Sequence, residues 1–168
     1  LDFRGRMYPI PVLFQPQGND LAKGLLRFGE GKRIENEENL DWLRVHGANC
    51  FGVDKVSYQD RVKWIKEKEE EIKQYAEDPI NNQGWTEADK PFQFLAFCRE
   101  YAQVLSVGYG FVSHLPIYVD GTCNGLQHYS ALLRDEEGGR AVNLTDAEIP
   151  SDIYAIVADK VSEKLRDN

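Results

Sequence analysis

The chain has 168 residues, of which 42% are hydrophobic and 29% charged, and its formal net charge is −8. This composition is typical of a globular domain and excludes collagen, coiled-coil and intrinsically disordered chains. No apolar run approaches the roughly 20 residues of a membrane-spanning helix, so no membrane partner is expected. The chain begins at Leu1 rather than Met, and we expect it to be an internal piece of a larger protein.

Charge is distributed unevenly along the chain. Residues 1–33 carry six basic and three acidic side chains, whereas residues 34–110 and 111–168 carry net charges of −6 and −5. The overall negative charge argues against an independent nucleic-acid-binding domain, because such domains are usually basic. The basic start is compatible with an anionic partner, and random surface charge explains it equally well.

The first elements in chain order are an extended segment and a short helix. Residues 7–14 are apolar but interrupted by two prolines, which favours an edge strand or an extended segment, because proline cannot donate a backbone hydrogen bond. Asn19 or Asp20 would cap a short helix over residues 21–26.

Residues 34–110 are predicted to form a helical block. Apolar residues at 40–48 indicate one short amphipathic helix, and a capping box at 57–60 begins another that ends at Pro79. Pro91 is placed near the start of a third helix. That helix is apolar nearly all round, so we expect it to be buried.

The last third of the chain is predicted to contain one strand and two helices. The apolar run at 115–119 is long enough for a buried strand, and residues 124–134 have helical spacing, with glycines 138–139 closing that helix. The final helix begins after Pro150. The residues expected to face inward on it are Ile153, Ile156, Val157, Val161 and Leu165.

The cysteines are few and widely spaced. No pair forms a C-x-x-C, and none lies near a histidine at ligand spacing. We expect Cys50, Cys98 and Cys123 to be reduced and buried as small apolar side chains.

The strongest local feature is Asp120 at the end of the predicted strand, followed by Gly121. Catalytic groups often lie where a strand ends and a loop begins. A carboxylate and an adjacent backbone carbonyl are hard oxygen donors that suit Mg2+. The simpler alternative is that Asp120 only caps the helix that follows.

The Asp-Gly-Thr sequence at 120–122 resembles part of the Asp-x-Asp-Gly-Thr loop of haloacid-dehalogenase-type phosphatases. In that family the nucleophile lies two residues before the second aspartate, and Tyr118 occupies that position here. A phenol on a strand cannot replace the carboxylate as phosphoryl acceptor. The resemblance therefore fails at the residue that performs the chemistry.

A longer stretch, residues 115–135, resembles the first catalytic palm motif of the single-subunit DNA-directed RNA polymerases of bacteriophages and mitochondria. Residues 2–6, followed by Tyr8, are similar to the Asp-x-x-Gly-Arg element of that family. Further blocks that resemble the family, in the right order, are residues 16–20, 42–49, 94–98 and 138–144. The last of these is closer to the phage branch than to the mitochondrial one.

The resemblance implies an α+β fold that is rich in helices, with a small antiparallel palm-type sheet and a helical insertion. Residues 1–30 would be the first palm segment and 31–110 the helical palm insertion. Residues 111–136 would contain the palm strand and helix with the catalytic aspartate. Residues 137–168 would begin the fingers.

The resemblance also implies roles for individual residues. Asp120 would be one of two aspartates that hold a catalytic Mg2+ pair, and the Gly121 carbonyl would contact the metal that carries the incoming triphosphate. Arg4 and Arg6 would lie against the template strand and the RNA–DNA hybrid. Tyr154 would be a fingers-side tyrosine close to the nucleotide site.

Each of these last assignments has a structural alternative. Arg4 and Arg6 would instead form surface ion pairs with Asp2 or Asp20, and Tyr154 would be a packing residue, as helix-face tyrosines commonly are. These alternatives make no use of a nucleic acid or nucleotide.

Two family elements are missing from the chain: the His-Asp-Ser loop with the second metal aspartate, and the nucleotide-binding helix with its Lys and Tyr-Gly. We therefore expect an internal palm-to-fingers fragment that is inactive alone. The intact protein would be a monomeric nucleotidyltransferase that synthesises RNA from nucleoside triphosphates on a DNA template, with Mg2+ as cofactor. Its expected location is the cytoplasm of a bacterial host, ahead of the mitochondrial matrix. The alternative of another class is a non-catalytic helical interaction module with a polymerase-like sequence.

Overall fold

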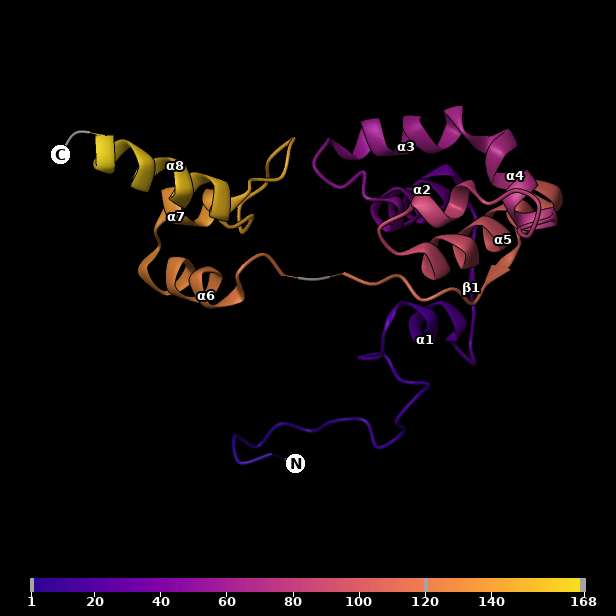
Figure 1. Cartoon of the computed structure of the whole chain (residues 1–168), viewed down its shortest axis with the longest axis horizontal. Coiled ribbons are helices and arrows are strands. Elements are labelled where there is room, and N and C mark those ends of the chain that lie inside the picture. Colours follow the sequence, from indigo (N-terminus) through magenta and orange to yellow (C-terminus); the bar gives the residue numbers. More distant parts are fainter. Residues whose placement is uncertain (1, 120, 167–168) are drawn as a thin grey trace. The chain divides into compact units, whose positions relative to one another are not determined.

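The structure is a computed structural model that describes residues 2–119 and 121–166. The chain divides into two compact units (Figure 1). The N-terminal unit comprises Leu1–Asp54 and Gln59–Tyr118, and the C-terminal unit comprises Lys55–Tyr58 and Val119–Asn168.

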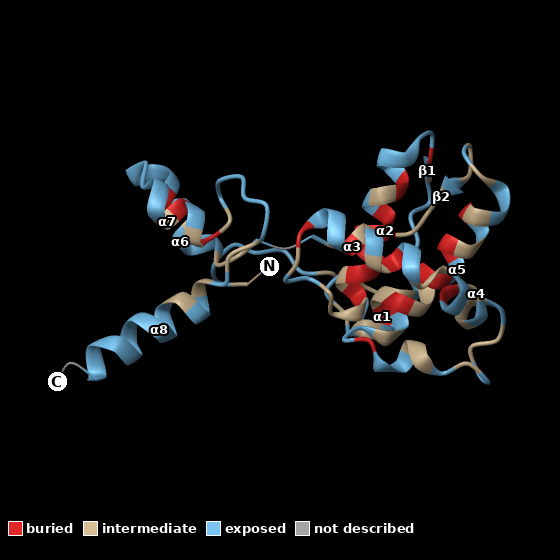
Figure 2. Ribbon diagram, turned by 90° about the horizontal axis from the view of Figure 1, so that it is seen from above, coloured by how far each residue is buried: buried red, intermediate tan, exposed pale blue. Residues whose placement is uncertain are grey.

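The N-terminal unit is built mainly from helices. In chain order they are α1 (Asp20–Leu25), α2 (Glu37–Phe51), α3 (Tyr58–Glu67), α4 (Glu69–Glu77), the 3-10 helix η1 (Gly84–Glu87) and α5 (Pro91–Val107). Helix α5 lies against α1, α2, α4 and η1, so it forms the centre of this unit. Figure 2 shows buried residues concentrated along α2 and α5.

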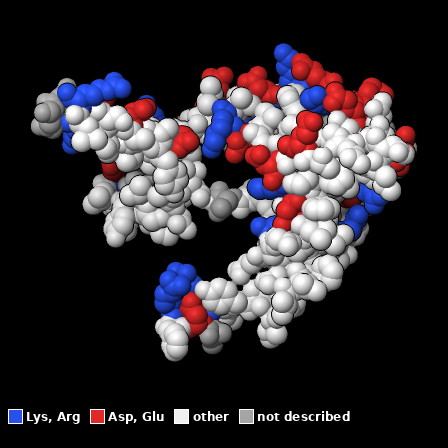
Figure 3. All heavy atoms as spheres, in the orientation of Figure 1, with Lys and Arg blue, Asp and Glu red and all other residues white. Residues whose placement is uncertain are grey.

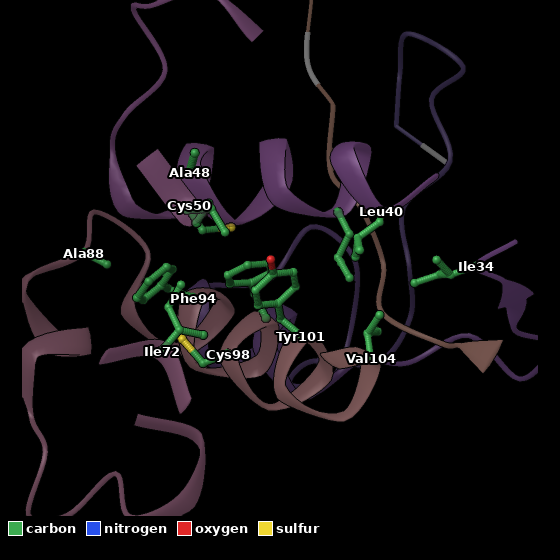
Figure 4. Packing of buried hydrophobic residues seen from close by; sticks show 13 residues of the cluster. Ile34, Leu40, Ala48, Cys50, Ile72, Ala88, Phe94, Cys98, Tyr101 and Val104 are labelled. Carbon is green, nitrogen blue, oxygen red and sulfur yellow. The ribbon is translucent and has the colours of Figure 1, made fainter. Parts of the chain in front are cut away.

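The core of the N-terminal unit consists largely of side chains from α5. Phe94, Phe97 and Tyr101 are almost fully buried, and their rings stack in sequence with centroids 5.8 Å and 5.3 Å apart. Figure 4 shows Phe94 and Tyr101 in this core. Helix α2 approaches them closely at Gly47, where an added Cβ would lie 2.4 Å from the Phe97 ring. The buried helix that the sequence predicts after Pro91 is therefore confirmed.

A small antiparallel sheet accompanies these helices. Strand β1 (Lys32–Arg33) pairs with β2 (Val112–Ser113) in the register Lys32↔Ser113 and Arg33↔Val112. The buried carboxylate of Glu100 on α5 accepts hydrogen bonds from the Ser113 hydroxyl (2.8 Å) and from the His114 backbone N–H (2.9 Å). These contacts fasten the sheet to the core, and the expected α+β class is confirmed.

The predicted strand at 115–119 is wrong for the described residues, which have no regular secondary structure there. Val119 is 90% exposed. Residues 7–14 likewise form no strand; they are largely exposed and bend at residues 10 and 12–14, so the expected edge strand or extended segment is not found. A strand leaves its backbone donors and acceptors unpaired unless another strand lies beside it, and within the described part of the chain neither apolar segment pairs with a strand.

The single helix predicted between residues 57 and 79 is also corrected. Lys68 interrupts it with φ −105° and ψ 13°, which separates α3 from α4. Helix α4 then ends at Glu77 because Asp78 precedes Pro79, and the residue before proline is disfavoured in the helical conformation.

The C-terminal unit contains α6 (Asn124–Leu133), α7 (Glu136–Ala141) and α8 (Ile153–Arg166). The prediction that glycines 138–139 close α6 is wrong. Helix α6 ends instead at Arg134, which adopts the left-handed conformation (φ 54°), and both glycines lie inside α7.

The expected inward face of α8 is not buried. No described residue of α8 is buried, and Val157, Val161 and Leu165 are 51%, 51% and 73% exposed. Figure 2 shows this helix mostly as exposed ribbon. The helical spacing in the sequence marks an apolar face correctly, but burial needs a neighbouring element that covers it. None of the helices in the described part of the chain is long and apolar enough to cross a lipid bilayer.

Candidate functional site

The proposed metal aspartate, Asp120, lies outside the described residues. The residues that follow it are part of the C-terminal unit. Helix α6 begins at Asn124, and Cys123 occupies its N-cap position with φ 51°. The alternative role of Asp120, as the cap of this helix, likewise falls on a residue outside the described ones.

The turn after Asp120 is connected to the rest of the C-terminal unit through Thr122 and Asn143. The Asn143 amide donates to the Thr122 hydroxyl oxygen at 3.0 Å and to the Ser151 carbonyl at 2.9 Å. The Asn143 side-chain oxygen accepts from the Ser151 N–H at 2.7 Å. Sequence reasoning assigned no role to Asn143, although it lies inside the 138–144 block that resembles the polymerase family.

Gln127 of α6 contacts the same region. Its side-chain amide donates to the Val142 carbonyl at 2.7 Å, and a Cβ added at Gly121 would lie 3.2 Å from the Gln127 Oε1 atom. The backbone at Gly121 therefore approaches a fixed polar side chain closely, which is one physical reason for a glycine at this position.

Tyr154 lies in the first turn of α8, and its residue is 73% exposed. Its backbone N–H donates to the Asp152 side chain at 3.0 Å, which caps the helix start. Among the described residues the Tyr154 side chain is therefore largely exposed rather than packed.

Arg4 and Arg6 lie on an exposed turn near the N-terminus. The Asp2 carboxylate accepts from the Arg4 and Arg6 backbone N–H groups at 2.8 Å and 3.0 Å and from the Tyr8 hydroxyl at 3.0 Å. These bonds, with the Arg6 N–H as the largest cause, hold the pKa of Asp2 below its usual value. Figure 3 shows basic side chains gathered at this turn.

The ion-pair alternative for the two arginines holds in part. The Arg4 Nε atom lies 3.6 Å from Asp2 Oδ2, yet the Arg4 side chain remains 69% exposed. Asp20 is occupied elsewhere, because its carboxylate accepts from the backbone of α5. Both guanidinium groups thus lie on an exposed turn whose backbone Asp2 organises.

No cluster of three or more His, Cys, Asp or Glu side chains that could hold a metal ion occurs within residues 2–119 and 121–166. The oxygen donors that the sequence proposes for a metal are Asp120 and the Gly121 carbonyl. Both are hard donors of the kind that Mg2+ prefers, but they fill only part of its coordination shell of six.

The buried His46 and Cys50 are adjacent but do not form a nucleophilic pair. The Cys50 sulfur lies 3.6 Å from His46 Nε2. Burial lowers the pKa of His46 to about 4 and raises the pKa of the Cys50 thiol to about 12, so both are neutral near pH 7. Cys50 and Cys98 are buried free thiols as expected, whereas Cys123 is only half-buried.

Comparison with known families identifies the class of the protein. Residues 33–168 match the model of the DNA-dependent RNA polymerase family. The match covers most of the chain, and the chain therefore belongs to this family. This membership favours the polymerase interpretation over the phosphatase resemblance.

Individual relatives agree with this assignment. The chain is 54% identical over 166 residues to the DNA-directed RNA polymerase of Enterobacteria phage T3, and 52% identical to T7 RNA polymerase of Escherichia phage T7. Each alignment covers 99% of this chain but 19% of the relative, so the chain spans about a fifth of their length. The mitochondrial DNA-directed RNA polymerase of Mus musculus is 44% identical over 97% of the chain and 14% of its own length. The predicted resemblance to the phage branch is confirmed.

Proposed function

We propose that this chain is the palm-to-fingers segment of a DNA-directed RNA polymerase. The observation that carries the proposal is the family match over residues 33–168, together with 52–54% identity to phage polymerases across almost the whole chain. In this proposal residues 1–30 and 111–136 belong to the palm, residues 31–110 form its helical insertion, and residues 137–168 begin the fingers.

Asp120 is the proposed catalytic residue, and with the Gly121 carbonyl it would hold Mg2+. Bound Mg2+ would supply the chemistry of two-metal nucleotidyl transfer, which is activation of the RNA 3′-hydroxyl and charge neutralisation of the leaving pyrophosphate. One carboxylate does not hold two cations tightly, so the second aspartate must come from outside this segment. The isolated chain is therefore proposed to be inactive in RNA synthesis.

Arg4 and Arg6 are proposed to contact the phosphates of the DNA template and the RNA–DNA hybrid. A guanidinium group is always charged near neutral pH and offers paired donors to phosphate oxygens. Such contacts hold the nucleic acid in register without reading its sequence. The exposed turn at residues 2–6 leaves Arg4 accessible for this role.

Tyr154 is proposed to lie beside the incoming nucleoside triphosphate. Its exposure on the first turn of α8 supports this assignment, because an aromatic face that is not packed is available to a nucleotide base or sugar. The intact enzyme is further proposed to act as a monomer in the cytoplasm of a bacterial host, on the strength of its phage relatives.

A chimera tests the function directly. Residues 1–168 replace the matching fifth of the phage T3 relative, and RNA extension from a primed DNA template is measured. We expect the chimera to extend RNA and Asp120→Asn to abolish extension while template binding persists. Asp146→Asn, an exposed acidic residue of the same unit, is the matched control and should retain extension. Unchanged extension in Asp120→Asn would favour the non-catalytic interaction module.

A further inference from the structure

Asn143 bridges the two parts of the C-terminal unit on which the proposed function depends. One part is the turn that follows Asp120, reached through Thr122, and the other is the segment before α8, reached through Ser151. Thr122 is two residues after the proposed metal ligand, and Ser151 is three residues before Tyr154. Three hydrogen bonds of 2.7–3.0 Å join them through one side chain.

The chemistry of this bridge suits asparagine specifically. Its amide nitrogen donates to both Thr122 Oγ1 and the Ser151 carbonyl, while its amide oxygen accepts from the Ser151 N–H. A carboxylate of the same shape has no N–H donor, so it loses the bond to the Ser151 carbonyl and bonds to Thr122 only when that hydroxyl turns to donate. The backbone of Asn143 is also left-handed, with φ 57°, a conformation that asparagine tolerates better than most residues.

The backbone of Asn143 is held in place from both sides. Its N–H donates to the Arg140 carbonyl at 3.2 Å, and the next N–H, of Leu144, donates to the Gly139 carbonyl at 2.8 Å. The preceding residue, Val142, is 1% exposed, and its carbonyl accepts from Gln127 of α6. A side chain on such a fixed backbone is preorganised, so it restrains the groups that it contacts.

We infer that Asn143 is a positioning residue, which couples the turn after Asp120 to the start of α8 and so holds the proposed metal-binding and nucleotide-binding residues in one arrangement. This inference rests on the proposed polymerase function. Loss of an outer-shell contact that orients a metal ligand typically lowers metal affinity or activity by about 10–100-fold. Asn143 reaches the proposed ligand only through Thr122, so we expect an effect at the lower end of that range.

The inference is tested with Asn143→Gly in the T3 chimera. Glycine keeps the left-handed backbone and removes only the bridge, so folding is not lost to backbone strain. We expect nucleotide addition to fall about 10-fold and the half-saturating Mg2+ concentration to rise about 10-fold. Thr122→Val should act in the same direction, because valine lacks the accepting hydroxyl. Thr122→Ser, which retains it, should restore both values.

The two substitutions remove one shared contact, so their effects should not add. Residues joined by a direct contact show non-additive effects, and the Thr122→Val, Asn143→Gly double variant should resemble Asn143→Gly alone. A purely additive loss would overturn the coupling.

A second readout does not depend on enzymatic activity. Hydrogen exchange of the Ser151 amide is measured in the 168-residue chain. It should accelerate in Asn143→Gly, which removes the acceptor, and stay slow in Asn143→Asp, which keeps it. Equal exchange rates in the wild-type, Asn143→Gly and Asn143→Asp chains would overturn the bridge itself.

The outcomes separate failure of this inference from failure of the proposed function. If Asp120→Asn abolishes addition but Asn143→Gly changes neither its rate nor its Mg2+ dependence, the positioning role is wrong and the function stands. If Asp120→Asn leaves addition intact, the proposed function fails and this inference with it.

Discussion

The carboxylate of Asp20, in the first turn of α1, accepts a hydrogen bond from the backbone N–H of Phe92 at 2.7 Å, across 72 residues of sequence. It also accepts from the Gln93 backbone N–H at 3.2 Å and from the Gln93 side chain at 3.0 Å. Asp20 thus caps the start of α5 from another helix and places a negative charge where the helix dipole is positive. Gly24 permits this close approach, because a Cβ there would lie 2.7 Å from the Phe92 carbonyl oxygen.

Asp20→Ala is expected to lower the free energy of unfolding of the chain by about 1–2 kcal/mol, the usual cost of losing a helix cap. Asp20→Asn, which keeps one side-chain oxygen as acceptor, should cost less. Urea denaturation followed by circular dichroism measures the difference, with the exposed Asp146→Ala as control. Equal stability of the Asp20→Ala and Asp146→Ala chains would contradict the capping role.

Tyr101→Phe is expected to destabilise the N-terminal unit by about 1–3 kcal/mol, because it leaves buried polar atoms without a partner. The Tyr101 hydroxyl accepts from Arg44 Nε at 2.8 Å and donates to the Glu69 carboxylate at 2.6 Å. Tyr129→Phe, at an exposed tyrosine of α6, is the matched control and should change stability little. Thermal unfolding measures both, and a similar melting temperature for the two variants would show that the buried hydroxyl contributes nothing.

Gly47→Ala is expected to destabilise the chain by about 1–3 kcal/mol, as overpacking of a close-packed core commonly does. The new methyl group would lie 2.4 Å from the Phe97 ring, which is fully buried and has little room to move. Gly125→Ala is the control, since a Cβ there meets nothing within 4 Å and alanine favours the helix. It should leave stability unchanged or raise it by up to about 1 kcal/mol. Denaturation midpoints that move together in the two variants would contradict the close α2–α5 contact.

Glu37 is expected to make the chain sensitive to acid. Hydrogen bonds from Lys66, Arg44 and Tyr109 lower its pKa from 4.5 to about 2. A lowered carboxyl pKa contributes stability above the unfolded value and loses it as pH falls toward the folded value. The loss should therefore occur between about pH 4.5 and pH 2, and because the Glu37 side chain is half exposed it should not exceed about 1 kcal/mol.

Glu37→Gln should flatten this part of the stability-against-pH curve, which denaturation at several pH values measures. His46 adds a separate loss of stability, because burial lowers its pKa from 6.5 to about 4. As the pH falls through this range the unfolded chain takes up a proton that the folded chain does not, which lowers the free energy of unfolding. The comparison of wild type with Glu37→Gln removes that shared contribution. Glu38→Gln, at the neighbouring exposed carboxylate, should keep the wild-type curve, and a flattened curve there would point to general surface charge instead.

Arg4→Ala and Arg6→Ala in the T3 chimera are expected to weaken binding of a template–RNA hybrid. Each should reduce the slope of log affinity against log salt by about one unit for each phosphate contact removed. Lys63→Ala, at an exposed lysine of α3, is the control and should leave the slope unchanged. An unaltered slope in an arginine variant removes the nucleic-acid assignment for that residue.

The sequence alone was sufficient for the features that depend on local pattern. The all-round apolar helix after Pro91, the helix over residues 124–133 and the membership of a polymerase family follow from spacing and from ordered motif blocks, which need no knowledge of distant contacts. The roles of Asp120, Arg4, Arg6 and Tyr154 remain predictions of that resemblance.

Other features depended on contacts between residues far apart in the chain, and only the tertiary structure decided them. Local capping rules could not decide which of Asn19 and Asp20 caps α1. The structure shows that Asn19 does so, whereas Asp20 caps α5 by accepting from a backbone N–H 72 residues away. Helical spacing marked an apolar face on α8 but could not say what covers it. The bridge from Asn143 to Thr122 could not be predicted from local pattern either. A side-chain hydrogen bond across 21 residues depends on how the intervening chain folds back.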